Sequence, residues 1–196
     1  MRAYVFVERV RGFGFWELEE SIADCRRMTE LGIKATTSLW GQYDMLIVIE
    51  RESEREIRTS IRSIVQECSR GARSLISNTT TMVVCSPTQD LLTTNECCYT
   101  VLAIDVAAGH DESVWKKLAP KDKEPVVCCD MVLGAHDIIV LVRQDPPHEN
   151  QPMTSAAYYE FLNNVVDKQS AIEKTRTMFG IPQQRRVKPK SERGKR

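Results

Sequence analysis

Residues 39–49 read Leu-Trp-Gly-Gln-Tyr-Asp-Met-Leu-Ile-Val-Ile, a polar turn that leads directly into an apolar run. This pattern predicts a turn followed by a buried β-strand. Residues 132–142 read Val-Leu-Gly-Ala-His-Asp-Ile-Ile-Val-Leu-Val, with Gly134 placed 93 residues after Gly41. The glycine, the aspartate and the apolar run recur at the same spacing, so the chain contains one structural unit twice.

The sequence around the first turn predicts four strands and two helices. A helix over about 15–31 precedes Gly32, which is placed to end it. A second helix follows Ser53, which forms a capping-box pattern with Glu56 ahead of apolar residues at helical spacing. The order is β-α-β-β-α-β, the ferredoxin-like arrangement. The strands are expected at 3–7, 33–40, 45–50 and within 73–84.

The second unit repeats this order with a shorter first helix. Pro120 and Pro125 leave room for only a turn or two of helix within 111–118, and a longer helix is expected over about 154–168. The strands are expected at 99–106, 126–133, 138–143 and around 175–178. The chain is divided into a first unit at 1–84, a linker at 85–96, a second unit at 97–182 and a basic, disordered tail at 183–196.

Both third strands are nearly continuous apolar runs, which indicates burial on both faces. Because the helices of such a unit cover only one face of its sheet, the other faces of the two sheets are expected to meet within one chain. The predicted fold is α+β, with tandem ferredoxin-like βαββαβ repeats that form a pseudo-dimeric α+β barrel.

Residues 3–84, with the Gly-x-Tyr-Asp turn before the third strand, resemble the effector-binding domain of the Lrp/AsnC regulators, also called the RAM domain. The second unit is similar in pattern, but Ala135-His136 replaces Gln42-Tyr43. In that family the domain senses small molecules, dimerises through its sheets, assembles further and binds amino acids near this turn at subunit interfaces. The resemblance implies a non-catalytic sensing or regulatory module, an amino-acid effector and a homo-oligomer.

The family places a winged helix-turn-helix before the effector domain, whereas this sequence begins at the first strand. Direct sequence-specific DNA binding is therefore not expected. A role in transcription regulation would act through a partner.

The chemistry of the turn suits a zwitterion. A glycine can bring backbone N–H groups close to an anion, and an aspartate three residues later can accept an ammonium group. The aromatic residues would add an apolar wall and a hydroxyl. The alternative is that glycine and aspartate serve the turn conformation and that the aromatics only pack. The candidate ligand-binding residues are Trp40, Gly41, Tyr43, Asp44, Gly134, His136 and Asp137.

Charge is unevenly distributed along a chain of zero net charge. The segment 183–196 carries seven Lys or Arg and only Glu192, so it is +6 and the remainder is −6. The body is therefore not expected to be a nucleic-acid surface. The tail is a weaker candidate for polyanion contact through Arg185, Arg186, Lys188 and Lys190.

Seven cysteines form no Cys-x-x-Cys pair, and their odd number indicates reduced, mostly buried thiols. The three histidines lie in different loops, so neither a metal site nor a cofactor is expected. No apolar run approaches the roughly 18 residues of a membrane span, and the chain is expected in the cytoplasm.

Two alternatives remain. One is an enzyme of the dimeric α+β barrel type, such as a small cofactor-free or haem-dependent oxygenase, with substrate held between the sheets. Only Asp105 and Asp130 place an acidic side chain within predicted apolar strands, which disfavours acid–base catalysis and favours a protein that is not an enzyme. The other is an ACT-like amino-acid-binding module, which would use a loop such as that containing Gly12 and Gly14.

Overall fold

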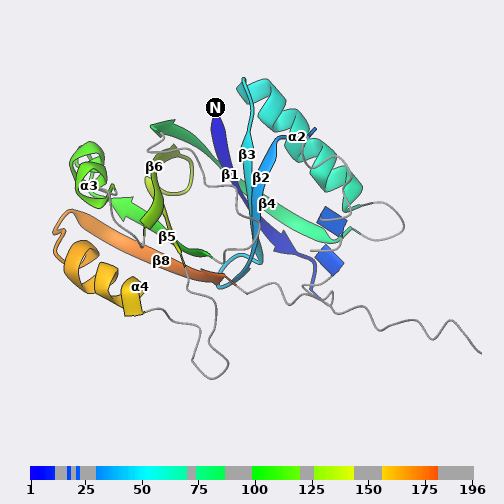
Figure 1. Ribbon diagram of the computed structural model, residues 1–196. Coiled ribbons are helices and arrows are strands. Elements are labelled where there is room, and N and C mark those ends of the chain that lie inside the picture. Colours follow the sequence, from blue (N-terminus) through cyan, green and yellow to red (C-terminus); the bar gives the residue numbers. More distant parts are fainter. Residues whose placement is uncertain are drawn as a thin grey trace, which may run out of the picture.

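The computed structural model shows an antiparallel barrel with helices on its outer faces (Figure 1). The described residues are 1–11, 17–18, 21–22, 30–69, 74–86, 99–119, 126–143 and 156–180. The strands are β1 (Arg2–Arg9), β2 (Ile33–Trp40), β3 (Met45–Glu50), β4 (Ile76–Ser86), β5 (Tyr99–Val106), β6 (Val126–Leu133), β7 (Ile138–Arg143) and β8 (Ile172–Gly180). The helices are α2 (Glu54–Glu67), α3 (Asp111–Leu118), α4 (Ala156–Phe161) and the π-helical η1 (Leu162–Val166).

The strands close into a barrel in the order β1-β3-β2-β8-β5-β7-β6-β4. Each half of the chain supplies four adjacent strands, and two seams, β2–β8 and β4–β6, join the halves. Leu39 pairs with Gly180 at the first seam, and Val132 pairs with Val84 at the second. The α+β class and the barrel predicted from the sequence are therefore confirmed.

The strand register is the same in the two halves. Phe6 of β1 pairs with Leu46 and Thr80, whereas Ala103 of β5 pairs with Ile139 and Arg176. Residues that occupy the same place in these ladders are called equivalent below. Phe6 is thus equivalent to Ala103, and the residues of the turn at 41–44 are equivalent to those of the turn at 134–137.

Side chains alternate between the barrel interior and its outer surface, as the pleat of a strand requires. Tyr4 and Phe6 belong to an interior apolar cluster built by both halves. Val5 and Val7 point outward into a second cluster with Ile57 of α2. A third cluster lies beneath α3, α4 and η1. Figure 1 shows α2 on one side of the barrel and α3 and α4 on the other.

The local signals of the helices are largely confirmed. Ser53 and Glu56 form the expected capping box at the start of α2. Gly32 has a φ of 69° in the turn before β2, where glycine is favoured. Residues 17–18 and 21–22 are helical, while 12–16, 19–20 and 23–29 lie outside the described residues, including Gly12 and Gly14. Residues 30–32 form a turn, so the helix expected over 15–31 does not include residues 30 and 31.

Two boundaries differ from the expectation. β4 continues to Ser86, which pairs with Met131 of β6, so the first residues of the expected linker belong to a seam. The helix expected over 154–168 is α-helical only to Phe161 and then π-helical to Val166. Phe161 and Val166 are both buried, and a π turn places residues five apart on one face.

The described cysteines are all free thiols. Cys68, Cys128 and Cys129 are buried, as expected, whereas Cys85 is exposed. Cys128 faces the barrel interior and Cys129 faces the helix layer, as expected for successive residues of a strand. None of the described helices is long and apolar enough to cross a membrane.

Candidate functional site

The first turn (41–44) joins β2 to β3 at one end of the barrel. Gly41 has a φ of 156°, and a Cβ there would lie 3.0 Å from the Met178 side chain of β8. The backbone amide of Asp44 donates to the Val7 carbonyl at 2.9 Å. The Asp44 carboxylate accepts hydrogen bonds from the Arg9 amide at 2.8 Å and from Arg9 Nε at 3.0 Å. Both carboxylate oxygens are therefore engaged at the end of β1.

The second turn (134–137) repeats this construction. Gly134 has a φ of 155°, and its Cβ would lie 3.0 Å from the Met82 side chain of β4. The Asp137 amide donates to the Ile104 carbonyl at 3.0 Å, and its carboxylate accepts from the Val106 amide at 2.8 Å. The shared glycine and aspartate thus hold the turn backbone in both halves. These contacts favour the turn-forming role of the two aspartates, and their role as ligand groups stays a prediction.

The aromatic residues expected to form one ligand wall lie in different environments. Trp40 ends β2 with 73% of its surface exposed. Tyr43 is buried, and its ring centroid lies 4.9 Å from that of Phe6 in the barrel core. Leu133, the residue equivalent to Trp40, is also exposed, at 69%. An exposed apolar side chain therefore comes directly before each turn.

His136 occupies the place equivalent to Tyr43 but has different contacts. Its side chain is only 2% exposed, and Nδ1 lies 2.5 Å from Oδ1 of Asp105 on β5. Its Nε2 is buried and has no hydrogen-bond partner among the described residues. A buried polar atom without a partner costs about 1–3 kcal/mol, so it requires an explanation. Among the described residues predicted for the site, His136 has a buried side-chain atom that lacks a hydrogen-bond partner.

Arg176 of β8 lies at this end of the barrel, and its side chain reaches across the β2–β8 seam. It lies directly opposite Ala103, whose side chain belongs to the interior cluster, so both project from the same face of the sheet. Its Nη1 donates to Oε1 of Gln42 in the first turn. Asp105 is the next residue of β5 on that face, roughly 7 Å along the strand from Ala103. Arg176 and the His136–Asp105 pair therefore flank Ala103.

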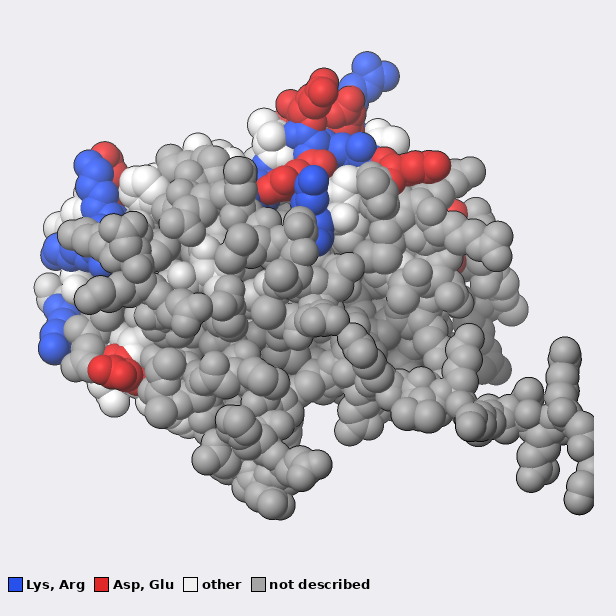
Figure 2. Space-filling model, in the orientation of Figure 1, with Lys and Arg blue, Asp and Glu red and all other residues white. Residues whose placement is uncertain are grey.

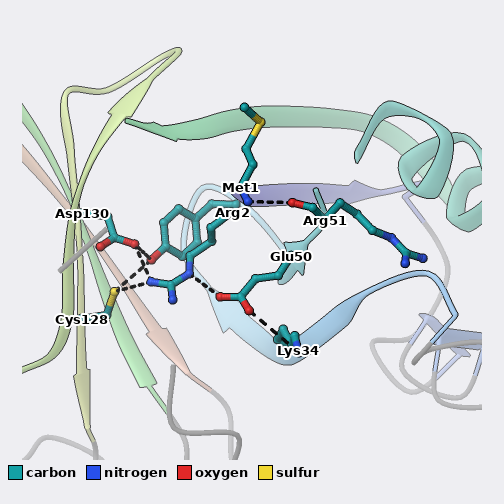
Figure 3. Close-up of polar contacts among 8 residues, drawn as sticks. Met1, Arg2, Lys34, Glu50, Arg51, Cys128 and Asp130 are labelled. Atoms are coloured by element: carbon teal, nitrogen blue, oxygen red, sulfur yellow. Dashed lines mark hydrogen bonds and ion pairs between the residues drawn. The ribbon is translucent and has the colours of Figure 1, made fainter. Parts of the chain in front are cut away.

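A second polar cluster lies inside the barrel near the start of β1 (Figure 3). The buried Asp130 carboxylate accepts from Arg2 Nη1 at 2.9 Å and from the Tyr4 hydroxyl at 2.7 Å. Cys128 Sγ lies 3.2 Å from the Tyr4 hydroxyl and 3.4 Å from Arg2 Nη1. Arg2 Nε also donates to Glu50 at 2.8 Å. The cluster links β1 and β3 of the first half to β6 of the second.

The thiol, the phenol and the guanidinium of this cluster keep fixed protonation states near neutral pH. Burial, with Asp130 adding to it, raises the pKa of the Cys128 thiol to about 12. Burial and the neighbouring Cys128 raise the pKa of the Tyr4 hydroxyl. Burial alone would lower the pKa of Arg2, but Glu50, Tyr4 and Asp130 raise it, so the guanidinium stays charged. The thiol is therefore not a reactive thiolate, and the arrangement is that of a structural ion pair.

The sequence carried a weak signal for both polar clusters. Asp105 and Asp130 stand out as acidic residues within otherwise apolar strands, and each proves to anchor one cluster. Arg2 and Tyr4, which bind Asp130, and Arg176, which lies beside Asp105 on the neighbouring strand, are far away in sequence and carry no motif. They become visible only when the ladders bring the strands together.

The surface over α2 carries charges of both signs. Figure 2 shows acidic and basic side chains intermixed at the top of the molecule. Arg58 and Glu54 of α2 form an ion pair. The tail residues Arg185, Arg186, Lys188 and Lys190 lie outside the described residues. Within the described residues, no group of three or more His, Cys, Asp or Glu side chains is placed to hold a metal ion.

Solved structures of known proteins share this fold. A siroheme decarboxylase solved with an iron-uroporphyrin III analogue has a TM-score of 0.57 at 9% identity, over 92% of this chain and 70% of its own. A major regulator of staphylococcal pathogenesis has a TM-score of 0.50 at 11% identity, over 94% and 100%. A candidate monooxygenase from Fusobacterium nucleatum has 0.50 at 9%, over 93% and 91%.

No protein-family model matches the chain, and the search of curated proteins gave no match. At identities near 10% the structural likeness shows the fold alone. The solved proteins with this fold include an enzyme and a regulator.

Proposed function

We propose that the chain is a non-catalytic module that senses a small molecule, an amino acid in particular, and resembles the Lrp/AsnC effector domain. In this proposal the barrel is a tandem pair of ferredoxin-like βαββαβ units, with the first unit extended through β4 to Ser86. The module acts in the cytoplasm as a homo-oligomer, and it influences transcription through a DNA-binding partner.

The proposal rests on the position of the two turns, because each lies next to a strand of the other half. A Cβ at Gly41 of the first half would lie 3.0 Å from Met178 of the second, and a Cβ at Gly134 of the second half would lie 3.0 Å from Met82 of the first. Each turn therefore rests on a strand of the other half, next to a seam. A molecule bound at a turn would touch both halves, so its binding free energy would depend on how the halves are placed. Such a differential interaction is what a sensor requires.

The proposed ligand region is the end of the barrel where both turns lie. It contains the residues selected from the sequence, with the glycines and the aspartates shaping the turns. The hydrogen bond from Arg176 to Gln42 adds a positively charged group at the seam. The His136–Asp105 pair adds Nε2 of His136, which has no hydrogen-bond partner among the described residues. A non-catalytic role is supported by the interior Arg2–Asp130 cluster, whose thiol and phenol remain protonated near neutral pH.

A thermal-unfolding screen of the purified chain against single amino acids, nucleobases and haem tests this function. A ligand present at about 100 times its dissociation constant adds about 2.7 kcal/mol of stability. For a chain of this size that is a rise in Tm of roughly 5–10 °C. We expect one or a few amino acids to produce it. Failure of every amino acid to raise the Tm would contradict the proposed function.

Trp40→Ala provides a variant that spares the core, because the side chain is largely exposed. We expect it to reduce the ligand-induced rise in Tm while leaving the Tm without ligand nearly unchanged. Tyr159→Ala is the matched control, since Tyr159 is an exposed aromatic residue on α4. Equal ligand responses in the two variants would remove Trp40 from the site.

An enzymatic function is the second proposal, and the His136–Asp105 pair favours it. A histidine oriented by a carboxylate, with its other nitrogen open, can take a proton from a bound substrate. Incubating the chain with each stabilising compound and following that compound by NMR separates the two functions. An unchanged compound supports the sensor, and a new product that disappears in His136→Gln supports the enzyme.

A further inference from the structure

We propose that Nε2 of His136 accepts a hydrogen bond from the ammonium group of an amino-acid ligand, and that Arg176 binds the carboxylate of that ligand. This inference rests on the proposed sensing function and moves the polar recognition away from the turn aspartates. Asp44 and Asp137, which the sequence suggested for the ammonium, already serve the ends of β1 and β5.

The first step concerns the proton on His136. An ionised carboxylate only accepts hydrogen bonds, so the contact with Asp105 assigns the imidazole proton to Nδ1. In the neutral ring the lone pair then lies on Nε2, which is buried and unpartnered among the described residues. The pair therefore presents an acceptor atom backed by a negative charge. A positively charged N–H donor fits it best.

The second step concerns the space beside the imidazole. In the first half, the equivalent place is filled by the packed rings of Tyr43 and Phe6. In the second half, the residue equivalent to Phe6 is Ala103, which brings a methyl group in place of a benzyl group. At this position of the strand the second half therefore has the smaller side chain.

The third step concerns the positively charged group that would bind the ligand carboxylate. Arg176 stands opposite Ala103, where the first half has Thr80 opposite Phe6. Its guanidinium reaches Gln42, a neutral acceptor that a carboxylate would outcompete. A cation binder and an anion binder on either side of one alanine match the two charged groups of a free amino acid.

Isothermal titration with the standard amino acids tests the assignment in the full chain. Asp105→Asn, His136→Gln and Arg176→Thr are each expected to weaken the binding seen in the wild type by at least about tenfold. Ala103→Phe, which copies the first half, is expected to abolish it. Glu8→Gln is the matched control, because Glu8 is equivalent to Asp105 and should leave binding unchanged. The Tm of each variant without ligand shows whether it is folded.

Nitrogen-15 NMR of the histidine rings reports on Nε2 directly. We expect the Nε2 resonance of His136, identified by its loss in His136→Gln, to move on addition of the binding amino acid or of methylammonium. Acetate should not move it. A ring resonance that no added compound moves would overturn the inference and indicate a buried water at Nε2.

The outcomes separate this inference from the proposed function. Amino-acid binding that survives His136→Gln and Arg176→Thr overturns the inference and leaves the sensor intact. The absence of binding by any amino acid overturns both. A response of His136 to acetate rather than to methylammonium overturns the assignment, because the site would then select anions.

Discussion

In the first half of the chain Tyr43 lies against Phe6 in the barrel core, whereas the equivalent positions of the second half hold His136 and Ala103. The two turns that carry these residues have nearly identical glycine φ angles, 156° and 155°, and both aspartates receive the backbone amide at the end of a strand. The backbone of the turn is thus retained in both halves, while the third residue of each turn decides whether the barrel interior there is apolar or polar.

The opposite end of the barrel shows the same division of roles. Arg2, Tyr4 and Asp130 form a buried network on one side. The residues equivalent to Arg2 and Asp130 are Tyr99 and Thr37, which cannot form an ion pair. Of the two equivalent places, each built from strands of both halves, one therefore carries the charged network. The predictions below exchange residues between equivalent positions to test this division.

Replacing Asp130 by the threonine of the equivalent position is expected to have the largest effect. It leaves the Arg2 guanidinium and the Tyr4 hydroxyl buried without their shared acceptor. Removing one partner of a buried ion pair costs about 3–5 kcal/mol. Urea unfolding of Asp130→Thr measures this loss. The control is Lys34→Ala, which removes a partly exposed contact of 3.9 Å to Glu50 and should cost less than about 1 kcal/mol. Similar losses in both variants would show that the network contributes little.

The two turn glycines come next. We expect Gly41→Ala and Gly134→Ala each to lower the free energy of unfolding by about 2–3 kcal/mol, because the φ angle is unfavourable and a methionine side chain lies 3.0 Å away. Gly134→Ala should be the costlier, since the Thr81 carbonyl lies 3.2 Å from its Cβ. Gly109→Ala is the control. It has a φ of 80° but open space around it, and about 1–2 kcal/mol is expected.

The third pair of variants compares the turn aspartates. Asp44→Ala and Asp137→Ala each remove an acceptor from a strand-end amide, and about 1–2 kcal/mol is expected for each. Asp44 also pairs with Arg9 Nε at 3.0 Å, with both side chains partly exposed. Salt screens such a pair, so the cost of Asp44→Ala should fall when unfolding is repeated in 1 M salt. An equal salt dependence for Asp137→Ala would mean that the two turns do not differ in this way.

The strands and most helices could be predicted because their signals are local. The bounds expected for β2, β3, β6, β7 and α3 are those observed, since the apolar runs and the prolines determine them. The extension of β4 to Ser86 was missed because its residues pair with β6, far away in sequence. The π-helical end of α4 follows from which side chains reach the core, which the spacing alone does not reveal.

The candidate site could be predicted only in part. The turn motif placed the candidate site at one end of each half, and it gave no sign that the two aspartates bind the strand ends beside them. Those strand ends lie 35 and 31 residues away, so the contacts with Arg9 and Val106 depend on the register of the fold. The pairing of His136 with Asp105 was missed for the same reason.

Cys128 provides the smallest expected effect and a test of pH dependence. Its equivalent in the first half is Ala35, so Cys128→Ala makes the halves more alike. The folded chain raises the pKa of this thiol from 9.0 to about 12, chiefly through burial. Between these values the folded state holds a proton that the unfolded state has lost, so the contribution of Cys128 is complete below pH 9 and declines as the pH rises toward 12.

The decline amounts to at most about 1.4 kcal/mol per pH unit for one thiol. We therefore expect the free energy of unfolding to fall less steeply between pH 9 and pH 10 in Cys128→Ala than in the wild type. The slope should remain negative in the variant, because burial also raises the pKa values of Tyr4 and Cys129. Urea unfolding at several pH values measures both slopes. Identical slopes would show that the thiol beside Asp130 ionises as readily as one in water, and that the interior of the second half is wetter than its contacts indicate.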